Sequence, residues 1–178
     1  METESAVLEL QYPIGKFQPR EDYTNEQTLQ SIENISKLPG LYSKLVGEIK
    51  DKLHQTYREG GWTGLQIVNH LADAYMNGLM RTKWLLTEDN PDVKPYDEQK
   101  FSKLADSTYE NIDSTIQLLK LLVERWVFLL RSLHHESFSR TTFHPENKTN
   151  YSLHKLIAMY DWHGYHHLAH LQIIKSKN

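Results

Sequence analysis

The residues best suited to chemistry in this sequence are histidines near its C-terminal end. Five of the ten histidines fall between His154 and His170, and histidine is the commonest metal ligand in proteins. His163 and His167 are four residues apart, so on a helix their side chains lie on one face. Both fall on an apolar seam where leucine would be expected. Two buried imidazoles side by side favour a shared metal ion; the alternative is a pair of core histidines hydrogen-bonded to backbone or tyrosine.

A third ligand is available in an earlier segment. His70 belongs to a line of polar residues at helical spacing, which comprises Gln66, His70, Asp73, Asn77 and Arg81. Such a line is either a solvated helix face or the wall of an internal polar pocket. If it faces the C-terminal helix, His70, His163 and His167 form a three-histidine site with one open position. An open position is typical of catalytic sites, where the ion lowers the pKa of a bound water towards neutrality.

Two assignments around this site stay open in the sequence. Asp73 is the candidate catalytic residue, as a partner of His70 or as a base near the bound water; equally, it is a solvated neighbour of Asn77. His166 and His170 also have the four-residue spacing and form an alternative pair. His166 lies off the apolar seam, so His163 and His167 are the first choice.

The composition excludes several classes of protein. A chain of 178 residues, 39% hydrophobic and 24% charged, is typical of one soluble domain. Its net charge of −3 argues against a nucleic-acid partner, and the absence of cysteine removes disulfides and thiolate ligands. The N-terminus lacks a signal-peptide pattern, and no apolar run approaches the roughly 18 residues that cross a bilayer. We therefore expect a cytoplasmic protein with no membrane partner.

The elements that must position the histidines are predicted to be four helices. Residues 1–22 are interpreted as an extended N-terminal arm. Thr24, with Gln27 three residues on, predicts the start of a long helix that is bent or broken at Pro39. Thr63 and Gln66 predict the start of a second helix that ends near Glu88.

The second half of the chain supplies the other two helices. Residues 89–101 are expected to form a crossover loop with at most one helical turn. Ser107 and Glu110 predict the start of a third helix that ends near Leu133. Residues 137–150 are interpreted as a loop, and Ser152 as the cap of the fourth helix. The fold class is therefore all-α, a single domain over residues 1–178 that forms a four-helix bundle with a long crossover between its second and third helices.

Several motifs in this sequence resemble the DinB/YfiT-like superfamily, in particular its YfiT branch, whose members are named as metal-dependent hydrolases. The similarity covers nearly the whole chain. The motifs that carry it are Tyr12–Phe17, Tyr57–Thr63, His70 within VNHLADAYMN, Leu86–Asp89, Lys94–Tyr96, Phe143–Glu146 and Trp162–His170. The resemblance implies a four-helix bundle with one divalent ion, zinc first and nickel as the alternative, held by His70, His163 and His167. It also implies a homodimer.

The resemblance leaves three functions to distinguish. The first is a metal-dependent hydrolase of a small-molecule substrate, in which Asp73 or a nearby tyrosine handles protons. The second is a thiol S-transferase, since other members use bacillithiol or mycothiol; the ion then activates the thiol, and Arg58, Asn77 and Arg81 are the candidate residues that bind this acidic cofactor. The third is a non-catalytic bundle with a closed, structural metal site.

Overall fold

Four long helices form the body of the protein, as the sequence predicts. The computed structural model describes residues 4–177. The long helices are α2 (Asn25–Glu48), α3 (Gly64–Thr87), α5 (Ile112–Arg131) and α6 (Leu153–Ser176). The shorter elements are the helices α1 (Glu4–Gln11) and α4 (Glu98–Phe101), the strands β1 (Thr141–His144) and β2 (Thr149–Ser152), and 3-10 turns at Lys50–Lys52, Ala105–Thr108 and His135–Ser139.

Three of the four long helices begin at the residue that the sequence predicts. Thr24 and Thr63 each form a reciprocal capping box with the glutamine three residues on, which satisfies two otherwise free backbone donors. The hydroxyl of Ser152 accepts from the backbone N–H of Lys155 at 3.2 Å and caps α6. These local bonds fix where the helices that carry the histidines start.

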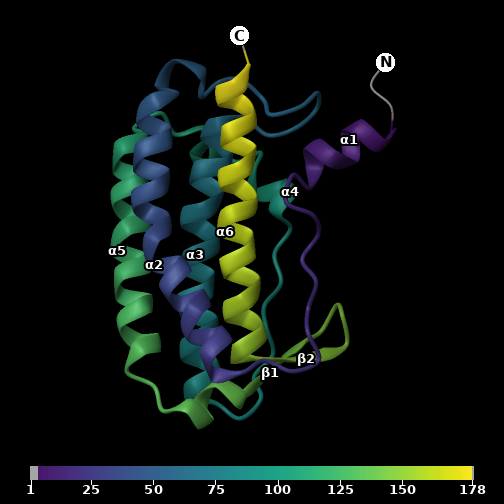
Figure 1. The fold of residues 1–178 in the computed structure, drawn as a ribbon, viewed down its shortest axis with the longest axis vertical. Coiled ribbons are helices and arrows are strands. Elements are labelled where there is room, and N and C mark those ends of the chain that lie inside the picture. The colour runs from purple at the N-terminus through teal and green to yellow at the C-terminus, as the bar shows by residue number, and fades with distance from the viewer. Residues whose placement is uncertain (1–3, 178) are drawn as a thin grey trace.

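The order of the helices around the bundle brings α3 and α6 together. Helix α2 packs against α5 and α6, and α3 packs against the same two helices, so α2 and α3 lie on opposite corners. Helices α3 and α5 run in the same direction, as α2 and α6 do (Figure 1). The link from α3 to α5, residues 88–111, must therefore travel the length of the bundle. This is the crossover that the sequence predicts.

Helix α5 begins later than the sequence predicts. Ser107 lies in a 3-10 turn, and the N-cap is Asn111, whose side chain accepts from the backbone N–H of Ser114 at 3.4 Å. The interpretation of Ser107 and Glu110 as a capping box was wrong. A nearby asparagine, which is also a strong N-cap residue, starts the helix four residues further on.

Two segments expected to lack regular structure contain some. The loop expected at 137–150 contains most of a short antiparallel hairpin, in which Thr141 pairs with Ser152 and His144 with Thr149. The arm expected to be extended contains α1, and the residues between Gln11 and α2 are without a helix. Helix α2, by contrast, continues through Pro39 without a break. None of the helices described between residues 4 and 177 is long and apolar enough to span a membrane.

The centre of the bundle is an aromatic cluster on three helices. Trp126 of α5 is fully buried, and its ring lies edge-on to Tyr75 of α3 and Tyr160 of α6, with centroids 5.8 and 5.0 Å away. Its Nε1 donates to the hydroxyl of Thr82 at 2.9 Å, so the buried polar atom is satisfied. Tyr75 also donates to the main-chain oxygen of Tyr160 at 3.0 Å, so the cluster joins α3 to α6 next to His163, whose ring lies 6.3 Å from that of Tyr160.

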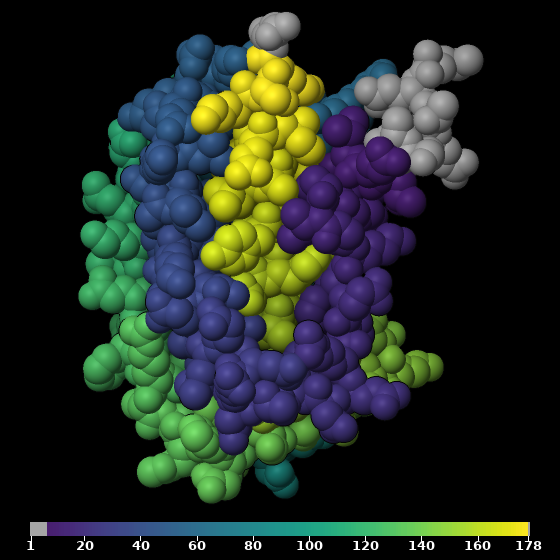
Figure 2. All heavy atoms as spheres, viewed as in Figure 1, coloured from purple at the N-terminus to yellow at the C-terminus, as the bar shows by residue number. Residues whose placement is uncertain are grey.

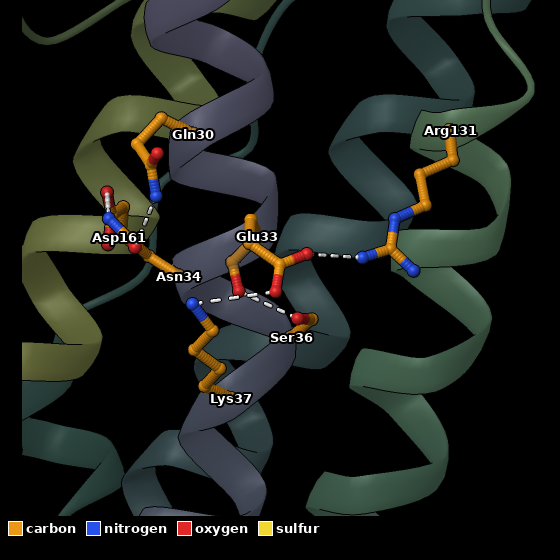
Figure 3. Close-up of polar contacts among 7 residues, drawn as sticks. All are labelled: Gln30, Glu33, Asn34, Ser36, Lys37, Arg131 and Asp161. Carbon is orange, nitrogen blue, oxygen red and sulfur yellow. Dashed lines mark hydrogen bonds and ion pairs between the residues drawn. The ribbon is translucent and has the colours of Figure 1, made fainter.

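Polar side chains tie α2 to its two neighbours at the surface. Asn34 Nδ2 donates to Asp161 of α6 at 3.1 Å, and Glu33 accepts from Arg131 of α5 at 2.7 Å (Figure 3). The pair of Glu33 and Arg131 is about half exposed, so it contributes little to stability. These two contacts orient α2 relative to α5 and α6, and they add little to the free energy of unfolding.

We expect the variant Gly164→Ala to destabilise the fold. A Cβ at Gly164 would lie 2.5 Å from the hydroxyl oxygen of Tyr75 and would overlap Leu38 of α2, so α6 must move away from its neighbours. The expected loss in free energy of unfolding is about 1–3 kcal/mol, as for other overpacked cores. Urea unfolding measures it. The matched control is Gly40→Ala in α2, where a Cβ meets nothing within 4 Å. Because alanine is more favourable than glycine inside a helix, we expect this variant to gain roughly 0.5–1 kcal/mol in free energy of unfolding. Equal midpoints for the two variants would contradict this account.

Candidate metal centre

Three imidazole nitrogens converge between α3 and α6. The Nε2 atom of His163 lies 3.2 Å from Nε2 of His70 and 3.1 Å from Nε2 of His167. His70 and His167 are buried, and His163 is partly exposed. The structure therefore brings together the three residues that the sequence selects as candidate ligands. Two of them are adjacent on α6 by their four-residue spacing, and the third is added by the antiparallel packing of α3 on α6.

The spacing of these nitrogens suits a divalent ion. Zinc binds histidine nitrogen at about 2.0–2.1 Å in tetrahedral geometry, which places neighbouring ligand nitrogens about 3.3 Å apart. Burial, with a smaller effect from His166, lowers the pKa of His70 to about 4. Burial and the other histidines lower the pKa values of His163 and His167 well below the ordinary range. All three rings are therefore neutral at pH 7, which is the state that binds a metal.

A second group of histidines adjoins the first. His166, His167 and His170 are all buried, and each offers a ring nitrogen within 4.8 Å of the others. The ring of His166 stacks on Trp162, with centroids 4.6 Å apart, and its buried Nδ1 has no hydrogen-bond partner among the described residues. The two groups share His167. The alternative pair that the sequence leaves open, His166 and His170, thus falls in the second group.

Aromatic side chains from the segment before α3 enclose the histidines. The ring of Trp62 lies 4.8 Å from that of His70 and 6.0 Å from that of His167, measured between centroids. The ring of Tyr57 stacks on His170 at 4.0 Å. Neither aromatic is among the site residues predicted from the sequence, although both belong to the motif Tyr57–Thr63 around Gly60–Gly61. Both rings limit how far the imidazoles can turn.

Asp73 lies on α3 three residues after His70, on the same helix face. Burial, reinforced by the nearby carboxylate of Asp106, raises the pKa of the Asp73 carboxyl. Asn77 donates to the backbone carbonyl of Asp73 at 3.0 Å, so its amide is used within the helix. A carboxyl with a raised pKa holds a proton closer to neutral pH and is suited to proton transfer.

The two arginines predicted to bind a cofactor have different surroundings. Arg81 donates to the hydroxyl of Tyr160 and to the carbonyl of Lys94, each at 3.2 Å, and thereby fastens the crossover segment to the bundle. Arg58 donates to the carbonyl of Glu59 at 2.8 Å, while its buried Nε has no hydrogen-bond partner among the described residues. Arg81 is thus held by two hydrogen bonds to neighbouring residues, whereas Arg58 has a buried N–H without a partner in the described part of the chain.

The fold and the cluster together define a four-helix bundle with a group of histidines between two of its helices. The chain belongs to the DinB superfamily, which it matches over residues 35–171.

Several relatives match nearly the whole chain. It is 39% identical over 165 residues to a protein of Bacillus subtilis provisionally named metal-dependent hydrolase YfiT, with 92% of this chain and 93% of the relative covered. It is 42% identical over 161 residues to OB0782 of Oceanobacillus iheyensis, which has the same provisional name, with 90% and 92% covered.

Two solved structures resemble this one. The structure of YfiT from Bacillus subtilis, described as a probable metal-dependent hydrolase with an unusual four-helix bundle topology, superposes with a TM-score of 0.89 at 38% identity and covers 93% of this chain and 95% of its own. A mycothiol-dependent maleylpyruvate isomerase superposes with a TM-score of 0.65 at 18% identity, covering 81% of this chain and 60% of the isomerase. The second likeness concerns the fold alone.

Proposed function

We propose that this protein is a metal-dependent hydrolase of a small molecule, with one divalent ion, zinc first and nickel as the alternative, bound by His70, His163 and His167. The observation that carries the proposal is the convergence of three Nε2 atoms of neutral imidazoles, in which those of His70 and His167 lie 3.2 and 3.1 Å from that of His163. The names of the relatives agree with it. Three histidines leave one position of a tetrahedral ion for water or substrate.

The residues around the cluster have separate tasks in this proposal. When bound, the ion supplies Lewis acidity and lowers the pKa of a water or thiol beside it. Trp62 packs on His70 and His167 and keeps bulk water from their buried faces. Asp73, one turn along α3 from His70, accepts a proton from the reacting group, a role that its raised pKa suits.

Thiol S-transfer is the second candidate function. It needs a cation for an acidic thiol, and the unpartnered Nε of Arg58 is the observation that favours it. Arg81 already donates to Tyr160 and Lys94, which hold its side chain against the bundle. We therefore rank hydrolysis first and test both reactions in one experiment.

The experiment begins with untagged protein, because a histidine tag and a nickel column can introduce metal. Elemental analysis is expected to give about one equivalent of divalent metal per chain. Hydrolysis is then measured with p-nitrophenyl esters and a panel of amides, and S-transfer with bacillithiol and 1-chloro-2,4-dinitrobenzene, in which the thiolate sulfur displaces chloride. Turnover that needs metal but no thiol supports the hydrolase, and turnover only with bacillithiol supports the transferase. A metal-free protein with neither activity would refute both.

We expect Asp73→Asn to lower turnover by at least about 100-fold, the usual cost of losing a general base. The metal content should stay unchanged, because Asp73 is not among the three converging ligands. Steady-state kinetics and elemental analysis of the same sample measure the two effects. The matched control is Asp113→Asn on α5, where an exposed carboxylate pairs with Lys50 and normal turnover is expected. Unchanged turnover in Asp73→Asn would remove Asp73 from the reaction.

A further inference from the structure

His170 links a candidate metal ligand to the N-terminal segment. It lies one turn beyond His167 on α6 and is only 2% exposed. Its Nδ1 is 3.3 Å from Nδ1 of His167, and its Nε2 is 3.3 Å from the main-chain oxygen of Gln11. The ring of Tyr57 stacks on it at 4.0 Å and fixes its plane. Both nitrogens of this buried ring therefore have a defined partner.

The residue that contacts Nε2 of His170 belongs to the N-terminal segment, which the sequence predicts to be an extended arm. Gln11 is the last residue of α1, and the carbonyls of a final helical turn have no partner within the helix. The N-terminal segment lies against one side of α6 (Figure 2). Trp162 of α6 holds it there by donating from Nε1 to the carbonyl of Gly15 at 3.2 Å. The oxygen of Gln11 is thus placed against His170.

These contacts determine which nitrogen carries each proton. A carbonyl oxygen only accepts, so Nε2 of His170 carries the proton and Nδ1 of the neutral ring is an acceptor. The contact between the two Nδ1 atoms is then favourable only if His167 donates from its Nδ1. A neutral His167 with a proton on Nδ1 has its lone pair on Nε2. That is the atom that lies 3.1 Å from Nε2 of His163.

We propose that His170 and the carbonyl of Gln11 form a relay that sets the tautomer of His167 and so directs its Nε2 lone pair to the divalent ion. The relay rests on the proposed function, and His170 is a positioning residue in it. Metal-binding histidines commonly donate their other N–H to an acceptor that fixes the ring. Here the acceptor is a second imidazole, oriented in turn by the N-terminal segment. The relay also favours the first histidine group, because a proton on Nδ1 of His167 prevents that atom from binding an ion together with His166 and His170.

The first test reads the tautomer without any metal. In metal-free full-length protein at neutral pH, long-range 1H–15N correlation spectra are expected to show His167 protonated at Nδ1. In His170→Phe, which keeps a ring against Tyr57 but removes the acceptor, the Nε2-protonated form should increase. In His170→Asn, the amide oxygen lies near the former place of Nδ1 and should restore the original tautomer. A wild-type His167 protonated at Nε2 overturns the relay.

The second test measures zinc affinity by competition with a chelator. His170→Phe is expected to bind zinc about 10–100-fold more weakly, as when an outer hydrogen-bond partner is lost, and His170→Asn to bind more tightly than His170→Phe. The matched control is His166→Phe, the same substitution one turn back on the same helix, which should keep the wild-type affinity. Equal zinc affinity in wild type and His170→Phe overturns the relay. An equal loss in His166→Phe overturns it in favour of the group of His166, His167 and His170.

The two tests separate failure of the relay from failure of the proposed function. If wild-type protein binds no zinc, the proposed metal site is refuted. The spectra of the metal-free protein still show which ring nitrogen of His167 carries the proton. If zinc binds and needs His163, but His170→Phe leaves both tautomer and affinity unchanged, only the relay is refuted. Urea unfolding of each variant identifies a loss of affinity that comes from a damaged fold.

Discussion

His163→Ala is expected to leave the purified protein with almost no bound divalent metal, against about one equivalent in the wild type. Nε2 of His163 is the nitrogen that contacts both other candidate ligands, at 3.2 and 3.1 Å. Its removal leaves two ligands on different helices. The loss of affinity should exceed the roughly 10–100-fold that follows loss of an outer partner. Elemental analysis and chelator competition on untagged protein measure it.

The matched control for this variant is His154→Ala. His154 is a buried histidine on the same helix, and its Nδ1 lies 2.5 Å from the hydroxyl of Thr28 on α2. The variant therefore loses a buried hydrogen bond, at a cost in stability of about 1 kcal/mol or more, but should keep its metal. Full metal content in His163→Ala would show that the three-nitrogen cluster is not the binding site.

The metal-free protein is expected to lose stability steeply as the pH falls from about 6.5 to 4. Burial, then the charges of neighbouring histidines, lowers the pKa of His70 to about 4 and that of His166 to about 3. Burial also lowers the pKa of His170 to about 4. A histidine with a lowered pKa in the folded state binds fewer protons there than in the unfolded chain, so acid favours unfolding. A shift from 6.5 to about 4 corresponds to roughly 3 kcal/mol per histidine.

Carboxyl groups oppose this effect without cancelling it. Burial raises the pKa values of Asp73, Glu98 and Asp161, so these groups take up protons more readily in the folded state and stabilise it as the pH falls. In the unfolded chain the pKa values of Asp and Glu lie near 4, well below that of histidine. The more numerous histidines therefore decide the sign between pH 6.5 and 5.

Urea unfolding of chelator-treated protein at several pH values measures this dependence. His166→Phe removes one buried titrating ring, and its slope should fall by up to about 1.4 kcal/mol per pH unit. Zinc at 100 times its dissociation constant should add about 2.7 kcal/mol at pH 7, because it binds the folded state. A midpoint that stays constant from pH 7 to pH 5 would contradict the burial of these rings as neutral groups.

The parts of the fold that depend on local bonds were predictable from the sequence. Thr24, Thr63 and Ser152 each accept from a backbone N–H three residues on, and such caps are visible as short motifs. The same rule failed at Ser107, because Asn111 competes with it within four residues. The hairpin was missed because its strands have four residues each and one of them, Thr149–Ser152, contributes no buried side chain. In a strand this short, apolar and polar residues do not alternate often enough to identify it from the sequence.

The site was predictable only as far as one helix positions it. The spacing of His163 and His167 requires only α6, and His70 follows if α3 is its neighbour, which the sequence allows but does not determine. The order of the helices around the bundle settles that point. The role inferred for His170 was out of reach, because its partner is a main-chain oxygen at Gln11. Backbone atoms are the same at every residue, so no side-chain pattern identifies them.

The wide separation of the contacting residues along the chain has a consequence for biosynthesis. His70 and His163 are 93 positions apart, and Gln11 and His170 are 159 apart. A ribosome releases the chain in order, so α2 and α3 emerge with only one of the three nitrogens. A nascent chain halted before Leu153 has no partner for His70 and cannot hold an ion as we propose. Uptake of the ion therefore marks a chain whose last long helix has been made and docked, and metal content would measure the completed fraction in a newly translated sample.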